Sequence, residues 1–529
     1  MRTSVWLLLF AAACSSSPAR TGNHDGGSNP GHDGGGPFMP GPPETHDIVD
    51  PSLPMGVVGG FDSATPQAGA LSVVYPQSGV ILPHDLAPID VQWNAVGGAT
   101  VYRVTYAVTT GDRLRGYVPK ADWIPTATDW QWLMDRASGH TVTLTVDGGT
   151  ADASGKISNA VGSAPQPLSV SHDDATGALF YFATTGDQIS GDGTLERLEV
   201  GAQAPDKYLN KSNDGGRCVG CHTLTRDGTR LAFDFLDFGG VGGALSLGSV
   251  DASNPTMQQA AASTPVAQAT FNPDGSKLLT SYQGKLTLRD GTTGAQISTV
   301  TTSSAALYPD WSPDGAHVVF VRPSSLCSPG VLPFGQDSIF VYGGSLVTMD
   351  VSNGTFSNEQ VLLAPTSGEN FYYPSYSPDG KYIAFSRADG TTKSSWSVAN
   401  MACNGKDGSG LSYDNPSAEV WLVSSTGGQG FPLTAANGGP MRTNSWPKWG
   451  PKSDGEYLWL SFTSTRPYGN VLAGANAHHQ IWIAAVQPAT MDIGGADPSA
   501  PAVWFPFQDT TTKNHIGMWS VKVGDYTIP

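Results

Sequence analysis

Residues 376–385 read Tyr-Ser-Pro-Asp-Gly-Lys-Tyr-Ile-Ala-Phe, and the same pattern returns four more times along the chain. A short strand runs into Pro-Asp-Gly, where Pro presets φ and Gly accepts a positive φ, and the chain returns as an apolar strand. The other copies lie at 225–233, 271–280, 311–320 and 449–460. Their spacing of about 40 to 75 residues is that of propeller blades with insertions.

The repeat resembles that of the TolB-like six-bladed β-propellers, and the resemblance covers residues 166–529. Five blades begin near residues 218, 268, 308, 373 and 446, and third strands are expected at 338–341, 419–423 and 480–483. The sixth blade would be shared between the ends, with strands at 178–182, 195–200 and 518–523. We expect an all-β fold with six blades, a count uncertain by about one.

A second β domain is predicted before the propeller, at residues 73–165. Short runs such as 89–93, 101–106 and 142–146 alternate between apolar and polar residues. That period of two indicates a β-sandwich, and the stretch from Pro88 resembles fibronectin type III and related Ig-like domains. Its tryptophans are interpreted as core residues: Trp93, Trp123, Trp130 and Trp132.

The N-terminus is typical of an exported protein. Residues 1–13 carry Arg2 and an apolar run too short to span a bilayer. The run ends in three alanines and Cys14, which resembles a bacterial lipoprotein signal with Cys14 as the lipidated residue. Ala11 stands where that pattern usually has Leu, so cleavage after an A-x-A site is the alternative. Residues 14–72 are predicted to be a disordered tether rich in Gly and Pro, with His-Asp pairs interpreted as solvated linker or, alternatively, as metal ligands.

Composition excludes some partners. The formal net charge is −17, which argues against nucleic acid and against adsorption to anionic lipid. Contact with a membrane is therefore expected through the lipid anchor only. The sequence contains no G-x-S-x-G, H-E-x-x-H or Walker pattern, so it offers no rival active site of those kinds.

Residues 218–222 read Cys-Val-Gly-Cys-His, the pattern that attaches a c-type haem. Cys218 and Cys221 can each form a thioether to a haem vinyl group, and His222 can then ligate the iron from the proximal side. Five Cys and 11 His in 529 residues make an accidental match rare. The alternatives are a disulfide between the two cysteines, a redox pair, or half of a zinc site.

The repeat register predicts where this motif lies. Aligning Asp227-Gly228 with Asp379-Gly380 places His222 on Pro374, and the same comparison places it on Pro309 and Pro447. These prolines begin the innermost strands, so the haem is expected over the axial mouth of the propeller. Candidates for the distal ligand reach the same face: His515 or Met518, with Met441 or an open position as alternatives and His478 and His479 as weaker candidates.

The remaining cysteines are Cys327 and Cys403, and both follow the second strand of their blade. In an exported protein this even remainder predicts one disulfide, with two free thiols as the alternative.

Together these features predict an exported c-type haem protein, lipid-anchored in the outer membrane, that relays single electrons to a redox partner protein that the sequence does not identify. An open iron site would instead make it a peroxidase-like haem oxidoreductase. A third interpretation, implied by the TolB resemblance, is a scaffold without haem that binds proteins through the propeller and sandwich.

Overall fold

The computed structural model describes residues 42–69, 71–185, 193–210, 218–236, 244–250, 258–259, 266–326, 340–394, 408–451, 454–491 and 496–521. For residues 218–221, 234–236, 244, 258–259 and 408 it describes the backbone alone. The chain divides into two compact units, residues 1–43 and 44–529. The fold described below belongs to the second unit.

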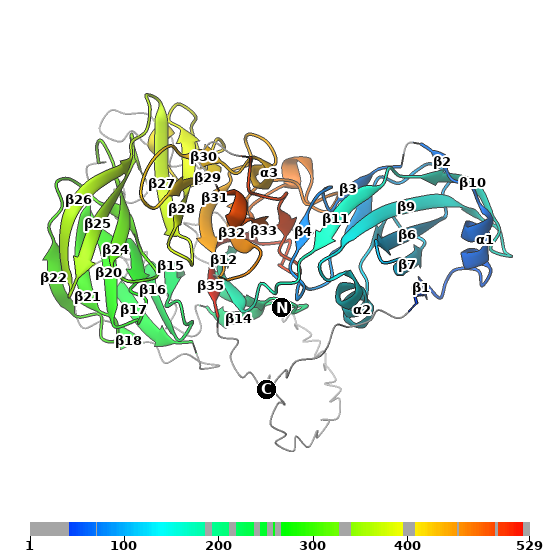
Figure 1. Ribbon diagram of the computed structural model, residues 1–529, viewed down its shortest axis with the longest axis horizontal. Coiled ribbons are helices and arrows are strands. Elements are labelled where there is room, and N and C mark those ends of the chain that lie inside the picture. Colours follow the sequence, from blue (N-terminus) through cyan, green and yellow to red (C-terminus); the bar gives the residue numbers. More distant parts are fainter. Residues whose placement is uncertain are drawn as a thin grey trace, which may run out of the picture. The chain divides into compact units, whose positions relative to one another are not determined.

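The second part of this unit is a β-propeller of six four-stranded sheets (Figure 1). Neighbouring strands within each sheet are antiparallel, because the Pro-Asp-Gly turns reverse the chain. The innermost strands contact one another in a closed ring, which defines the propeller axis. From inside outward the five blades that are continuous in sequence are β15 (Cys218–Leu224), β16 (Arg230–Leu236), β17 (Ala244–Ser249) and β18 (Gln258–Gln259); β19 (Gln268–Phe271), β20 (Lys277–Tyr282), β21 (Lys285–Asp290) and β22 (Gln296–Val300); β23 (Leu307–Trp311), β24 (His317–Arg322), β25 (Ser345–Ser352) and β26 (Thr355–Leu363); β27 (Glu369–Tyr376), β28 (Tyr382–Asp389), β29 (Glu419–Ser424) and β30 (Phe431–Pro432); β31 (Ser445–Trp449), β32 (Leu458–Ser464), β33 (Gln480–Val486) and β34 (Val503–Trp504).

The sixth blade joins the two ends of the propeller sequence, as predicted. Its innermost strand is β35 (Lys513–Ser520), drawn in red beside β12 (Ala178–Thr184) in Figure 1. β13 (Thr194–Glu199) and β14 (Asp206–Leu209) complete the sheet. Closure of this kind leaves no sheet edge at the axis and ties the C-terminal strand into the ring.

The turns owe their shape to three residues of the repeat. The amide of Gly380 donates to the carbonyl of Ser377 at 2.9 Å, and Gly380 has φ 74°. The Asp379 carboxylate accepts from the Ser377 hydroxyl at 2.6 Å, which closes the turn from the side-chain direction. The same bonds recur around Gly315, which also has φ 74°.

One predicted strand is wrong. The third strand of the blade that begins at β23 is β25, not residues 338–341. Phe340 instead makes an isolated bridge with Leu411, and residues 338 and 339 lie outside the described residues. An insertion precedes β25, so a short apolar run inside it was taken for the strand.

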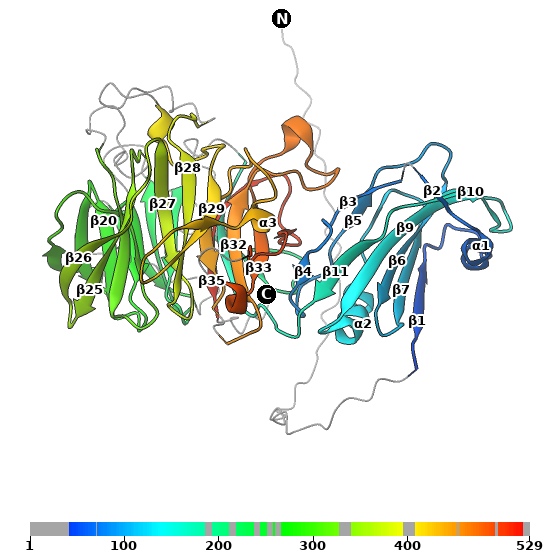
Figure 2. The same cartoon turned by 45° about the horizontal axis from the view of Figure 1, so that its top comes forward.

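The first part of the unit is a β-sandwich (Figure 2). Its larger sheet runs β1 (Thr45–Val49), β7 (Arg113–Val118), β6 (Val101–Val108), β9 (Thr141–Ala151), β10 (Ile157–Gly162) and β2 (Gln67–Ala68), with β11 (Gln166–Val170) and β4 (Ile81–Leu82) attached beside β9. Its smaller sheet consists of β3 (Val73–Tyr75), β5 (Val91–Trp93) and β8 (Asp122–Trp123). The helices of this part are α1 (Val57–Ser63) and α2 (Ala127–Ala137). The two sheets contribute to one hydrophobic cluster, so they pack face to face.

Two boundaries of this domain were predicted wrongly. Residues 45–49 form β1 and pair in parallel with β7, so the tether does not extend to residue 72. β11 pairs with β9, so the sandwich continues past residue 165. Both segments are too short or too polar for their sequence pattern to predict a strand. Three of the tryptophans are buried as expected (Trp93, Trp123 and Trp130), and Trp132 is half-buried on α2.

Short helical turns complete the described secondary structure: α3 (Thr434–Asn437), η4 (Gly408–Gly410), η5 (Gly474–Asn476) and η6 (Pro488–Thr490). Across the described residues, no helix has both the length and the apolar character needed to cross a membrane.

Candidate functional site

The innermost strands share a local irregularity that positions the site. In four blades the register shifts by a bulge whose residue has a positive φ: Tyr308, Tyr373, Trp446 and Ile516. The residue after each is Pro309, Pro374, Pro447 or Gly517. In β15 the register shifts between Val219 and His222. Gly220 and Cys221 therefore occupy the bulge in β15, and His222 pairs with Phe233 as Asp310 pairs with Val319. Counted by the bulge, His222 lies one residue beyond the place of those prolines, which the repeat register had predicted for it.

The imidazole of His222 is buried, with 7% of the residue exposed. Its Nε2–H donates to the carbonyl oxygen of Phe180 on β12 at 3.1 Å. Its Nδ1 is buried and has no hydrogen-bond partner among the described residues. Burial lowers the pKa of His222 to about 4, so the imidazole is neutral at pH 7.

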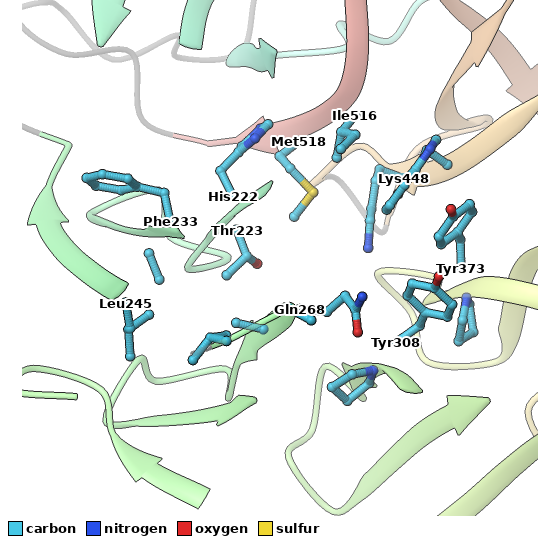
Figure 3. Close-up of a pocket in the computed structure, with 17 residues that line it drawn as sticks. His222, Thr223, Phe233, Leu245, Gln268, Tyr308, Tyr373, Lys448, Ile516 and Met518 are labelled. Atoms are coloured by element: carbon cyan, nitrogen blue, oxygen red, sulfur yellow. The ribbon is translucent and has the colours of Figure 1, made fainter. Parts of the chain in front are cut away.

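Figure 3 shows the pocket beside His222 at the inner strands of the propeller. Met518 and Ile516 of β35 line it together with Thr223, and the ammonium of Lys448 points into it. Burial lowers the pKa of Lys448, and the nearby carboxylate of Asp310 offsets part of this effect. The remaining polar lining is Gln268, Tyr308 and Tyr373, and Pro309 and Pro374 lie in the same wall.

Two features of His222 bear on ligation of a haem iron. The ring is neutral, and because Nε2 donates to Phe180 the lone pair is on the unpartnered Nδ1. Ligation through Nε2, which is usual for this motif, would require His222 to give up its hydrogen bond to Phe180. The pocket has a volume of about 60 Å³, which admits roughly four water molecules. A porphyrin has no room inside it, so a haem would have to lie at its mouth.

The two predicted distal ligands lie in different places. Met518 shares the pocket of His222 and pairs in register with Phe180, the residue that accepts the His222 hydrogen bond. His515, on the same strand, does not line that pocket. It lies with His479 and Asp414 in a separate group of three ligand-bearing side chains. Met441, the alternative, is exposed.

The sequence did not predict that group as a unit. The sequence predicts His479 and His515 only as separate candidates for an iron ligand, and it gives no prediction for Asp414. Asp414 lies in a loop before β29 and carries no motif around it. No sequence signal marks it, because its proximity to the two histidines arises only from the tertiary fold.

Several predicted residues cannot be placed. Cys14, Cys327 and Cys403 lie outside the described residues, so the lipidation and the disulfide stay predictions. The structure describes the backbone of Cys218 and Cys221, in β15 next to His222, and not their side chains.

No family model matches this chain, and no curated protein matches its sequence. Solved structures of TolB-like β-propellers are similar to it. TolB from Acinetobacter baumannii matches at 12% identity over 91% of this chain and 97% of that chain, with a TM-score of 0.40. Putative TolB from Agrobacterium tumefaciens matches at 14% identity over 64% and 97%, with a TM-score of 0.34. The β-propeller domain of the Trilobed protease from Pyrococcus furiosus matches at 11% identity over 65% and 79%, with a TM-score of 0.30. These similarities concern the fold and say nothing of function.

Proposed function

We propose that this chain is an exported c-type haem protein that relays single electrons, with the haem at the axial mouth of the propeller. The observation that carries the proposal is the Cys-Val-Gly-Cys-His motif on an innermost strand, where its histidine is buried and neutral with an unpartnered ring nitrogen. When bound, the haem would supply a one-electron couple.

The chain's own residues would hold that group in place. Cys218 and Cys221 would attach it, and His222 would ligate the iron. β15 pairs with β16, and the carbonyl of Phe180 restrains the ring of His222. A ligand held by a paired strand and a hydrogen bond changes position little when the charge at the iron changes.

Met518 is the proposed distal ligand. It is a thioether-bearing lining residue of the pocket that His222 also lines. Methionine as the second axial ligand raises the reduction potential, as suits an electron carrier. Among the described residues no carboxylate lines the pocket, so the acid or base that peroxide chemistry needs close to the iron would have to be Lys448 or a tyrosine.

The proposed location follows from the N-terminal residues. Lipidation at Cys14 would anchor the chain in the outer membrane, on a side that the sequence does not specify. The redox partner would be another protein.

The test is an optical spectrum of the full chain, made in a host that matures haem c. We expect a sharp α-band after reduction that stays with the chain after denaturation. Carbon monoxide should leave the spectrum of the native protein unchanged and should bind to the Met518→Ala variant. Binding of carbon monoxide to the unaltered protein would instead support an open-site oxidoreductase. A colourless protein would contradict both haem functions and would leave the protein-binding scaffold without haem as the remaining function.

A further inference from the structure

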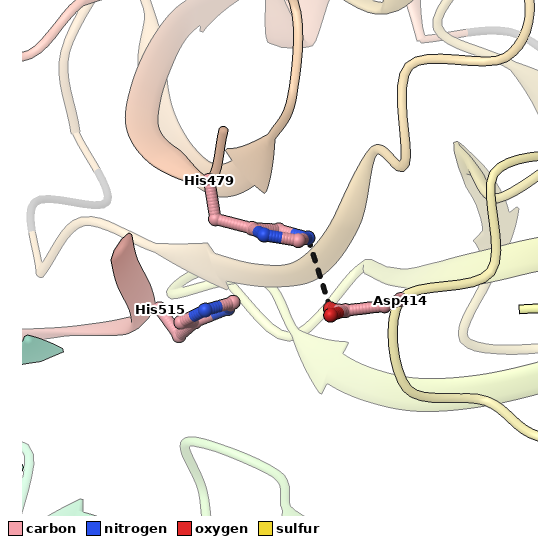
Figure 4. Close-up of side chains that lie close together, drawn as sticks. All are labelled: Asp414, His479 and His515. Atoms are coloured by element: carbon pink, nitrogen blue, oxygen red, sulfur yellow. Dashed lines mark ion pairs between the residues drawn. The ribbon is translucent and has the colours of Figure 1, made fainter. Parts of the chain in front are cut away.

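A second potential ligand set lies outside the pocket of His222. Asp414, His479 and His515 each offer one ligand atom, and these atoms all lie within 4.8 Å of one another. We call these three residues the His-Asp cluster. Figure 4 shows the two imidazoles facing each other and the carboxylate of Asp414 at their edge.

The three residues come from separate parts of the propeller. Asp414 lies in the insertion before β29, His479 immediately precedes β33, and His515 lies in β35. The amide of Asn514 donates to the carbonyl of His479 at 2.8 Å, which holds the two histidine-bearing segments side by side. The ring centroids of His479 and His515 are 4.3 Å apart.

Both histidines of the cluster are buried, and Asp414 is half-buried. His515 is 1% exposed and His479 is 7% exposed. Nε2 of His479 lies 2.9 Å from a carboxylate oxygen of Asp414 and is buried without a properly oriented hydrogen bond. A cation bound by both groups would give this buried nitrogen a partner.

We propose that the His-Asp cluster binds one divalent transition-metal ion of the zinc class. Two imidazoles and one carboxylate are a ligand set that such ions prefer, and the set leaves a further position for water. Ligand atoms of a tetrahedral zinc site lie about 3.4 Å apart, given bond lengths of about 2.1 Å. Nε2 of His479 and the Asp414 oxygen are closer than this, at 2.9 Å, and all three ligand atoms lie within 4.8 Å of one another, so the side chains would have to shift to complete the site.

Neighbouring residues can support the metal ligands. The hydroxyl of Tyr413 lies 3.2 Å from Nδ1 and 3.3 Å from Nε2 of His515, and it can orient that ring. Nε2 of His478, the neighbour of His479, is buried without a partner among the described residues, but His478 does not belong to the group of three. Lys513, whose charge opposes a cation, is the unfavourable neighbour.

The ion would have a structural role. It would connect the closing strand β35 to the start of β33 and to the insertion of the preceding blade. Closure of the ring otherwise depends on β35 pairing with β12. Because a metal that binds the folded state alone adds its binding free energy to folding, the cluster would secure the point at which the ring closes.

The experiment uses the full chain after treatment with a chelator, titrated with Zn²⁺ by calorimetry and counted by elemental mass spectrometry. The variants are His479→Ala, His515→Gln and Asp414→Asn. The matched control is His317→Ala, which removes a histidine that contacts Asp350 at 3.1 Å outside any group of three ligands among the described residues. The unaltered chain and all the variants contain the same histidines in the N-terminal tether, so any zinc bound there is equal in each and does not affect the comparison.

We expect the unaltered chain and His317→Ala to bind one more Zn²⁺ than His479→Ala. Asp414→Asn should bind that ion about 100-fold more weakly or not at all. If His515→Gln does not fold, Asp414→Asn still tests metal binding. That variant should fold, because Asp414 lies in a loop and the asparagine amide has the same shape as the carboxylate. Equal zinc binding by all the proteins would overturn the proposal. So would a Co²⁺ titration of the unaltered chain that gives no visible ligand-field bands.

Discussion

His222 on β15 and His515 on β35 lie on neighbouring inner strands of one propeller, but the sites to which they belong are built in opposite ways. His222 stands alone in a largely apolar wall, and its expected partners Cys218 and Cys221 lie within four residues of it in sequence. The His-Asp cluster collects three side chains that lie 36 to 101 residues apart in the chain, from Asp414 to His479 to His515.

The difference shows which sites can be found by reading a sequence. A ligand set confined to five consecutive residues has its geometry set by backbone connectivity, so the motif identifies it. A set gathered from three segments exists only after the ring has closed. Its members look like isolated histidines and an ordinary loop aspartate until then.

The largest expected effect is on the motif. Replacing both motif cysteines, Cys218→Ser together with Cys221→Ser, should leave no haem with the denatured chain, because both thioether bonds are lost. Haem staining after denaturing electrophoresis measures this. Cys403→Ser is the control and should keep its stain, since it lies outside the motif. Equal staining of both variants would contradict the haem assignment.

A buried carboxyl group in the sandwich, Asp90, makes the free energy of unfolding depend on pH independently of both histidine sites. Burial first, and then Asp122, raises the pKa of Asp90 to about 7. Asp90 therefore keeps its proton in the folded chain at pH values where it loses the proton in the unfolded chain. The contribution of Asp90 to stability is fully present below a pH of about 4 and is lost as the pH rises to about 7. The loss is about 3 to 4 kcal/mol.

Asp90→Asn should remove this dependence and raise the free energy of unfolding at pH 8, as measured by urea denaturation at pH 5 and pH 8. Asp152→Asn, at a fully exposed carboxylate, is the control and should keep the pH dependence of the unaltered chain. A stability of Asp90→Asn that still falls with pH would contradict the assignment.

Adding Zn²⁺ to the metal-free chain tests the His-Asp cluster without involving the haem motif. Zn²⁺ at 100 times its dissociation constant should raise the free energy of unfolding by about 2.7 kcal/mol in the unaltered chain. The His479→Ala variant should gain nothing, because it lacks a ligand. Thermal unfolding with and without Zn²⁺ measures both, and Cys221→Ser should respond as the unaltered chain does. A gain shared by His479→Ala would place the ion elsewhere.

The smallest expected effect concerns Tyr413. Tyr413→Phe keeps the ring and removes the hydroxyl that lies near both nitrogens of His515. The affinity for Zn²⁺ should fall about 10-fold, which is about 1.4 kcal/mol, because the imidazole loses an orienting group. Calorimetry of the folded variant measures the change, and the reduced haem spectrum should not change with it. An unchanged affinity would mean that Tyr413 does not orient the ligand.

Much of the fold could be predicted because the repeat is local. Pro-Asp-Gly turns, such as those around Gly315 and Gly380, recur with the strands they connect, and a blade cannot bury its faces without neighbours. The strand β25 could not be placed, since an insertion separates it from its turn. β1 was missed because its pairing with β7 is a contact across 68 residues, such as Thr45 with Arg113, that no local pattern records.

The sequence by itself determined the propeller, its closure by the C-terminal strand, and the position of His222 among the prolines of the inner strands. These follow from turn chemistry and spacing, which act over a few residues. The tertiary structure alone decided that Met518, and not His515, lies beside His222, and that His515 joins His479 and Asp414. The bulge at Ile516 in β35 lies between these two candidate ligands, and only the paired strand shows it.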